Sequence, residues 1–288
     1  MTDNQVGTPP VGEDSTDFYW QQARDSLLTP VALQLFQIAA KHDGEKFDSA
    51  KSLIDKEYAI IRGKTSERHG GKFQTAVQVY QEAGWISLAD EKLTVTDAGR
   101  QALALLAEAP DFLKAVPDYV VELLTRYQIN NPAKPPVRND EIAELRKTSD
   151  LFPYWTLWKV MRSCDNELTV EELQRFVFQL HRTEDIEGTI KAIKAFRVDK
   201  VKLDQGQLDA KYPPKLQGAN GEPKYWMARA GAQIGKHPAM IEKSTPSTYV
   251  LNQNYVPLVD RVLANEPVFM DYLTEDTWLA EYGKPRFG

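Results

Sequence analysis

Apolar residues recur three and four positions apart in the first third of the chain, the spacing of a helix with one buried face. Pro30 suits the first turn of a helix, and Gly84 is the residue type that ends a helix in the left-handed conformation. The pattern therefore predicts three successive helices, over residues 29–42, 48–58 and 72–83. Phe73, Ala76, Val77 and Tyr80 form the predicted inward face of the third helix.

Short apolar runs replace the helical spacing directly after Gly84. Residues 85–88 are typical of a strand, residues 89–92 of a turn, and residues 93–95 of the returning strand. Thr96-Asp97 then caps a further helix over residues 98–106. The predicted order is three helices, a β-hairpin and a helix.

This stretch, EAGWISLADEKLTVTDAGRQAL, resembles the end of a winged helix-turn-helix domain. The resemblance implies a winged helix within a domain over residues 18–130, and so implies binding to duplex DNA. In that family the third helix enters the major groove and the hairpin, or wing, lies over the DNA backbone. The residues that carry the match are Gly84, Trp85, Ile86, Leu93, Thr94, Thr96, Gly99 and Leu103.

Polar residues on the outward positions of the third helix, and on the segment leading to it, are of types that contact DNA. Arg and Lys pair with phosphate or guanine, Gln pairs with adenine, and Ser and Thr bind phosphate oxygens. From Arg62 to Gln81 there are four basic residues and one acid, Glu67. The predicted DNA-binding residues are Lys64, Thr65, Ser66, Arg68, His69, Lys72, Gln74, Thr75 and Gln78.

The wing is less suited to a phosphate backbone, since it sets Lys92 against Asp90 and Glu91. Many winged helices bind proteins instead of DNA, and polar residues are usual on any exposed helix. A role as an adaptor in a multi-subunit assembly is therefore the alternative reading of this domain.

The second half of the chain begins at a proline-rich linker over residues 131–140. A helical domain is predicted over residues 141–205. It contains a dense aromatic helix near Trp155 and Trp158, a capping box at Thr169 and Glu172, and a helix over residues 186–196. The stretch FPYWTLWKVMRSCDNELTVEELQRFVFQLHR resembles the recognition part of type IIS restriction endonucleases of the AlwI kind, which join winged-helix modules to a nuclease domain.

Residues 206–223 carry three prolines and are predicted to be loose. After them the order helix, strand, turn, strand, helix returns, with strands over residues 240–243 and 248–251. The sequence therefore favours a second winged-helix-like module over residues 206–288, although a helical domain with one hairpin explains the same pattern. The predicted DNA-binding residues of this module are Lys224, Arg229, Gln233 and Lys236, with His237 beside them.

Composition narrows the class of protein. Hydrophobic residues make up 42% of the 288 residues, enough to form packed cores, while residues 1–17 are polar and predicted to be a disordered tail. A single cysteine, the absence of a long apolar run and the absence of a leader pattern predict a cytoplasmic protein that does not enter a membrane. The net charge of −6 counts against a protein that simply coats DNA, but it does not exclude a local basic face.

No cofactor, metal or catalytic set is predicted. Gly63-Lys64-Thr65 lacks the upstream glycine of a phosphate-binding loop, because Tyr58 stands at that position. The acid-x-lysine fragments at Asp90 and Glu222 have no upstream acid to complete a nuclease site, so a divergent Mg²⁺-dependent nuclease ranks last. His181 with Glu184 and Asp185 is explained better as a surface cluster, and Cys164 as a buried, inert thiol.

The sequence therefore predicts a mainly α-helical protein with small β-hairpins, of the α+β class. It contains one winged helix-turn-helix and, more weakly, a second one in tandem, joined by a helical segment. The favoured function is DNA binding, as a regulator or as the recognition subunit of a bacterial defence or restriction system, and protein subunits of a larger complex are the alternative partners.

Overall fold

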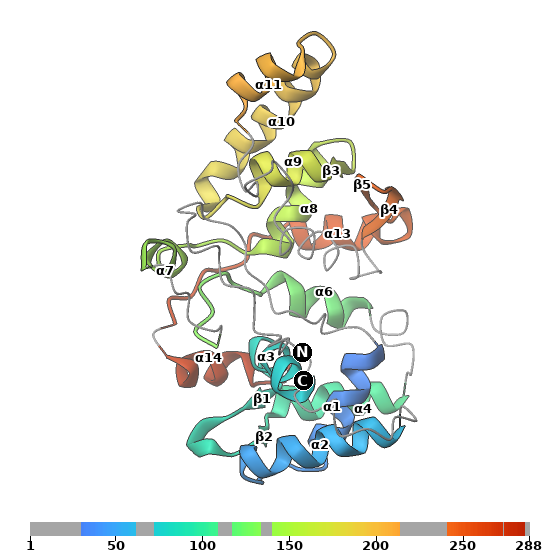
Figure 1. Ribbon diagram of the computed structural model, residues 1–288, viewed down its shortest axis with the longest axis vertical. Coiled ribbons are helices and arrows are strands. Elements are labelled where there is room, and N and C mark those ends of the chain that lie inside the picture. Colours follow the sequence, from blue (N-terminus) through green and yellow to red (C-terminus); the bar gives the residue numbers. More distant parts are fainter. Residues whose placement is uncertain are drawn as a thin grey trace, which may run out of the picture. The chain divides into compact units, whose positions relative to one another are not determined.

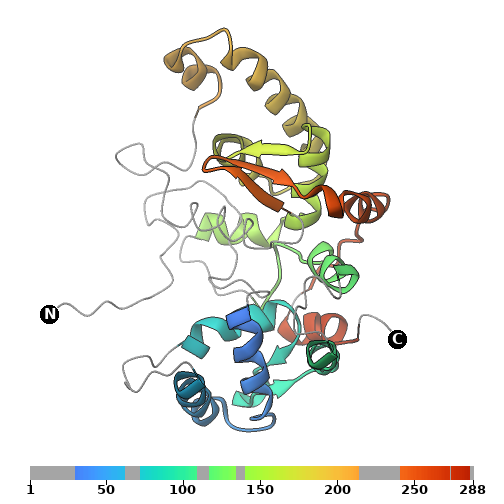
Figure 2. The ribbon, with the colours of Figure 1, turned by 90° about the vertical axis from the view of Figure 1, so that its right-hand side faces the viewer.

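The computed structural model describes residues 30–61, 72–108, 117–133, 140–213, 241–272 and 274–285 (Figures 1 and 2). The chain divides into two compact units. The terminal unit comprises Ala23–Tyr127, Asn131–Pro135 and Met270–Gly288, and the central unit includes Gln128–Asn130 and Pro136–Phe269. The residues after Phe269 thus belong with the N-terminal part of the chain.

The terminal unit is mostly helical around an aromatic core. The Phe36 ring centroid lies 4.8 Å from that of Trp85, and the Tyr80 ring stacks on Trp85 with centroids 6.5 Å apart. Trp85 and Tyr80 are fully buried, so they contribute large apolar areas to stability. The helices are α1 (Pro30–Ala40), α2 (Phe47–Ile61), α3 (Lys72–Glu82), α4 (Asp97–Glu108), α6 (Pro117–Thr125) and α14 (Glu275–Tyr282).

A small sheet closes one side of this core. Strands β1 (Ile86–Ser87) and β2 (Thr94–Val95) form an antiparallel hairpin, and residues 89–91 form a 3₁₀ turn between them. The extended segment that leads into α2 pairs with the residues just before β2. Leu93 donates its N–H to the carbonyl of Glu45 at 2.9 Å, and Lys46 pairs with Lys92 in an antiparallel bridge. The segment before α2 therefore lies beside β2, which lies beside β1.

Helix α14 completes the terminal unit. Trp278 and Tyr282 stack with ring centroids 3.4 Å apart and form a buried cluster with Ala133. The Ala98 N–H at the start of α4 donates to the carbonyl of Gly283 at 2.8 Å. Gly84 adopts φ +72°, and a Cβ at this position would collide with the backbone carbonyl of Tyr282. Glycine at position 84 therefore both ends α3 and admits α14.

The central unit is built around α8, whose residues are buried over most of its length. Its three-stranded antiparallel sheet has the order β3-β5-β4, with Leu168 opposite Tyr249 and Lys243 opposite Tyr249 on the other side. The elements are α7 (Asp140–Lys147), α8 (Pro153–Ser163), β3 (Glu167–Thr169), α9 (Val170–Glu172), a π-helical turn over Leu173–Val177, α10 (Ile186–Lys200), α11 (Gln205–Lys211), β4 (Ile241–Thr245), β5 (Thr248–Leu251) and α13 (Val256–Leu263).

The two units share one order of elements. In the terminal unit, α1 is followed by the short extended segment before α2, then α2, and later the β1–β2 hairpin and α4. In the central unit, α8 is followed by β3, then α9, and later the β4–β5 hairpin and α13. In each, the last strand of the hairpin lies between the early strand and the first strand of the hairpin. Helices α10 and α11 are additional in the central unit, because the matching stretch of the terminal unit, residues 62–71, has only ten residues.

The predicted α+β class, mainly helical with small antiparallel sheets, is confirmed. The hairpins over residues 85–95 and 241–251 and the capping box at Thr169 are also confirmed. The prediction of a loose stretch from residue 206 was wrong for α11, where Asp204 forms a capping box with Gln207 that starts a helix. The sequence analysis also did not anticipate β3, α14 or the π-helical turn, because each is shorter than the window of about 11–18 residues over which apolar periodicity is recognised.

We expect Gly84→Ala to destabilise the terminal unit more than Gly44→Ala does. Both glycines have positive φ, +72° at Gly84 and +87° at Gly44, so both substitutions strain the backbone by about 1–3 kcal/mol. Only the Gly84 variant also pushes against α14, since nothing lies within 4 Å of a Cβ at Gly44. Urea unfolding followed by circular dichroism measures the difference, and equal losses of stability would contradict the packing of α14 against Gly84.

Candidate nucleic-acid interface

The predicted DNA-binding residues divide into three groups in the structure. Lys72, Gln74 and Thr75 lie in the first turn of α3, where only the backbone is described, and Gln78 lies one turn further on. The predicted residues that lie outside the described ranges are Lys64, Thr65, Ser66, Arg68, His69, Lys224, Arg229, Gln233 and Lys236. Their role in binding DNA stays a prediction.

Helix α3 is held on two sides. Its first turn is fixed to α2, because the Phe73 N–H donates to the Asp55 carboxylate at 2.9 Å. Its last turn is buried, and there Glu82 accepts hydrogen bonds from the Tyr127 hydroxyl and from the Gln78 amide. A carboxylate at the start of a helix and a satisfied carboxylate at its buried end both favour one fixed position for α3.

Gln78 is engaged within the terminal unit. Its amide donates to the Ala133 carbonyl as well as to Glu82, and its side chain is half-buried. A contact between Gln78 and a base would require these hydrogen bonds to be exchanged.

The hairpin of the terminal unit carries charges of both signs. Asp90 and Glu91 are exposed and adopt φ of 54° and 58°, so the turn presents two acids in the left-handed region. Lys46 and Lys92 lie opposite one another across the bridge, and both are exposed. The sequence analysis missed Lys46, because only the pairing of strands brings it beside Lys92.

The hairpin of the central unit differs from the first in its turn. Residues 243–248 read Lys-Ser-Thr-Pro-Ser-Thr and contain no acid. Ser244, Thr245 and Ser247 are exposed, and the Ser247 N–H donates to the Thr245 hydroxyl at 3.3 Å. Exposed hydroxyl groups on a tight turn are suitable donors to phosphate oxygens.

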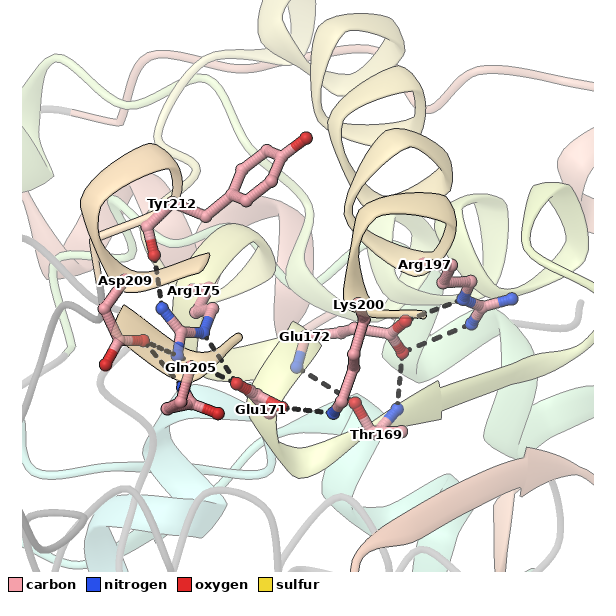
Figure 3. A network of polar contacts seen from close by, with 9 residues as sticks. All are labelled: Thr169, Glu171, Glu172, Arg175, Arg197, Lys200, Gln205, Asp209 and Tyr212. Atoms are coloured by element: carbon pink, nitrogen blue, oxygen red, sulfur yellow. Dashed lines mark hydrogen bonds and ion pairs between the residues drawn. The ribbon is translucent and has the colours of Figure 1, made fainter. Parts of the chain in front are cut away.

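A network of ion pairs joins α9 and the π-helical turn that follows it to α10 and α11 (Figure 3). The Glu172 carboxylate is almost fully buried, and it accepts hydrogen bonds at 2.6 Å and 3.2 Å from the Nε and Nη2 of Arg197. It also accepts the Thr169 N–H at 2.7 Å, which closes the capping box of α9. Glu172 thus fixes α10 to the end of β3.

Arg175 forms the second half of the network. Its guanidinium, only 5% exposed, pairs with Glu171 at 2.8 Å and with Asp209 of α11 at 2.6 Å. It also donates to the carbonyl of Tyr212, and Lys200 pairs with Glu171 at 2.5 Å. The Nε, Nη1 and Nη2 atoms of Arg175 thus each donate to an oxygen acceptor, as a buried charge requires.

The network changes the acidity of its members. Burial acts to raise the pKa of Glu171, but hydrogen bonds from Lys200 and Arg175 outweigh burial and lower that pKa. A hydrogen bond from Lys211 lowers the pKa of Asp199, and one from Arg175 lowers the pKa of Asp209. These carboxylates therefore stay ionised and paired in the folded protein at neutral pH.

Other chemistry is not indicated by the described residues. Within them, no group of three or more His, Cys, Asp and Glu side chains is arranged to hold a metal ion, and no helix is long and apolar enough to cross a membrane. Burial raises the pKa of the Cys164 thiol, and this effect exceeds the opposing influence of Arg197. Cys164 is therefore protonated and a poor nucleophile at neutral pH.

Comparisons with known proteins give a likeness to a solved structure. No protein-family model matches the chain, and no curated protein matches it. Among solved structures, the chain is similar to the BpuJ1 endonuclease binding domain, which was crystallised in complex with pyrene- and phenanthrene-modified DNA. The similarity covers 93% of this chain and 94% of that chain, with a TM-score of 0.60 and 14% sequence identity. At this identity the likeness shows a shared fold.

We expect the central unit to lose the contribution of Glu171 in acid. A carboxylate with a lowered pKa stabilises the folded state above its ordinary value of 4.5, and the effect is lost as the pH falls through the lowered pKa. The difference in urea midpoint between the wild type and Glu171→Gln should therefore shrink from pH 7 to pH 3. A difference that does not change with pH would show that the charge of Glu171 contributes nothing to stability.

Proposed function

We propose that this chain binds duplex DNA as the recognition part of a bacterial restriction or defence system, through two winged helices. The likeness to the BpuJ1 endonuclease binding domain, which extends over almost the whole of both chains, is the observation that carries this proposal. The faint sequence resemblance of residues 152–182 to the recognition part of AlwI-type restriction endonucleases points in the same direction.

The strand order of both units supports the winged-helix assignment. A winged helix places the early strand beside the last strand of the wing, and each unit has this order. In the terminal unit, α2 and α3 are then the two helices of the helix-turn-helix, with α3 in the major groove. In the central unit, the predicted DNA-binding residues Lys224, Arg229, Gln233 and Lys236 precede β4 in the sequence and lie outside the described ranges.

Two features of the hairpins fit contact with phosphates. Lys46 and Lys92 are like charges directly opposite one another, an arrangement that costs stability unless an anion lies between them. Among the described residues neither lysine forms an ion pair. The hydroxyl-rich turn of the central unit offers a second, uncharged set of donors.

An adaptor that binds proteins is the second candidate function. The exposed acids Asp90 and Glu91 at the tip of the first hairpin favour it, because they would repel a phosphate backbone. A partner that co-purifies in a fixed ratio, together with no DNA affinity that depends on salt, would select this function.

Charge reversal at Arg68 and Lys72 is expected to weaken binding to mixed-sequence duplex DNA. Each lost phosphate contact lowers the slope of log affinity against log salt by about 0.9, so the double variant should lose about 2. The matched control is Lys147→Glu with Lys284→Glu, which changes the net charge equally at exposed lysines paired with Glu144 and Glu281. Equal effects of the two pairs of substitutions, measured by fluorescence anisotropy, would contradict recognition through α3.

Neutralising the opposed lysines should move stability and DNA affinity in opposite directions. Lys46→Gln with Lys92→Gln removes a cross-strand repulsion of about 0.2–1 kcal/mol and should raise the urea midpoint. The same variant should lower the salt slope of DNA binding by about 1–2. The control is Lys41→Gln, whose lysine already pairs with Glu57 and should leave DNA affinity unchanged. Unchanged DNA affinity in the double variant would remove this hairpin from the interface.

A further inference from the structure

Helices α10 and α11, with the turn between them, form an arm that the shared plan of the two units does not require. The arm follows α9 and the π-helical turn of the central unit. The matching segment of the terminal unit, residues 62–71, has ten residues and is much shorter than Ile186–Lys211. Both views show α10 and α11 projecting beyond the sheet of their own unit (Figures 1 and 2). Ile190, Ile193 and Phe196 of α10 are buried in the core of the unit, so it is the exposed face of the arm that calls for another role.

The arm is rigidly attached at its inner face. Arg197 of α10 is bound by the buried Glu172, and Asp209 of α11 is bound by the buried Arg175 (Figure 3). Aromatic packing reinforces the ion pairs, since the rings of Phe176, Phe196 and Tyr212 meet edge to face with centroids 5.4–5.9 Å apart. A surface held by two arginine ion pairs, each with one buried partner, and by three aromatic rings is preorganised, which lowers the entropic cost of binding a ligand.

The outer face of the arm is basic and unpaired. Residues 186–212 contain six basic and four acidic residues, in a chain whose net charge is −6. Three of the four acids are already paired with basic groups. Glu187 pairs with Lys159, Asp199 pairs with Lys211, and Asp209 binds Arg175. Lys191, Lys194 and Lys202 are exposed and form no ion pair with any of the described residues.

The spacing of these lysines suits an extended row of phosphates. Lys191 and Lys194 are one turn apart on α10, and Lys202 follows just after its end, so the row spans about 16 Å at a rise of about 1.5 Å per residue. One strand of duplex DNA carries a phosphate every ~3.4 Å along the axis, so the row can meet several phosphates. Val198 and Val201, 53% and 88% exposed, lie among the lysines and provide apolar contact for the sugars between phosphates.

We propose that the outer face of this arm, Lys191, Lys194 and Lys202 with Val198 and Val201, is a further DNA-binding surface that contacts the sugar-phosphate backbone. It contributes affinity without reading sequence, because phosphate contacts carry no base information. The assignment rests on the proposed DNA-binding function of the chain. It adds a surface that belongs to neither hairpin nor to a recognition helix.

The test compares two triple variants of the full chain by anisotropy on mixed-sequence duplex DNA at roughly 50–200 mM salt. The first variant is Lys191→Gln, Lys194→Gln and Lys202→Gln. The matched control is Lys41→Gln, Lys147→Gln and Lys284→Gln, three exposed lysines outside the arm that are each paired with an acid. Circular dichroism establishes that both variants are folded.

The arm variant is expected to lose about 2–3 from the salt slope and on the order of tenfold in affinity at the lowest salt, while the control changes the slope by less than about 1. Equal slopes for the arm variant and the wild type would overturn the assignment. If that result occurs while charge reversal at Arg68 and Lys72 still weakens binding, the proposed function stands and only the arm is excluded. Absence of salt-dependent binding by the wild type would overturn both.

Discussion

The pairing of an early strand with the last strand of a hairpin is the constraint on which both units depend. In the central unit β3 pairs with β5, and in the terminal unit the segment before α2 pairs with residues 92–93. Each pairing is only two or three residues long, yet it sets the helix that follows it against the hairpin. The hairpin and the helix that follows the early strand are thus fixed to one another in each unit.

The units differ in how charge is placed on that frame. The first hairpin ends in Asp90 and Glu91 but opposes Lys46 to Lys92, whereas the turn of the second carries hydroxyl groups. In the central unit, the buried Glu172 and Arg175 pair with Arg197 and Asp209 of the arm and hold it in place. The lysines on the outer face of the arm take no part in these pairs. Local arrangement of charge, more than the net charge of −6, therefore decides where an anionic partner fits.

Much of the fold follows from local sequence signals. Gly84 ends α3, the Thr169 capping box starts α9, and short apolar runs separated by a turn mark both hairpins, because each signal acts within a few positions. What the sequence did not reveal depends on distant contacts. The pairing of Lys46 with Lys92, and the packing of α14 against Gly84 at the other end of the chain, follow from tertiary structure alone. Gln78 is a further case. Its residue type suits a base contact, but its amide donates to the distant Ala133 carbonyl, which the sequence alone does not reveal.

The central claim is that this chain binds duplex DNA through its phosphates. Anisotropy of the wild-type chain with labelled mixed-sequence duplex, over roughly 50–200 mM salt, tests it most directly. The account predicts an affinity that falls steeply with salt, by about three orders of magnitude if about six phosphates are contacted. No binding at the lowest salt, or an affinity independent of salt, would contradict it and would make the two units sites for a protein partner.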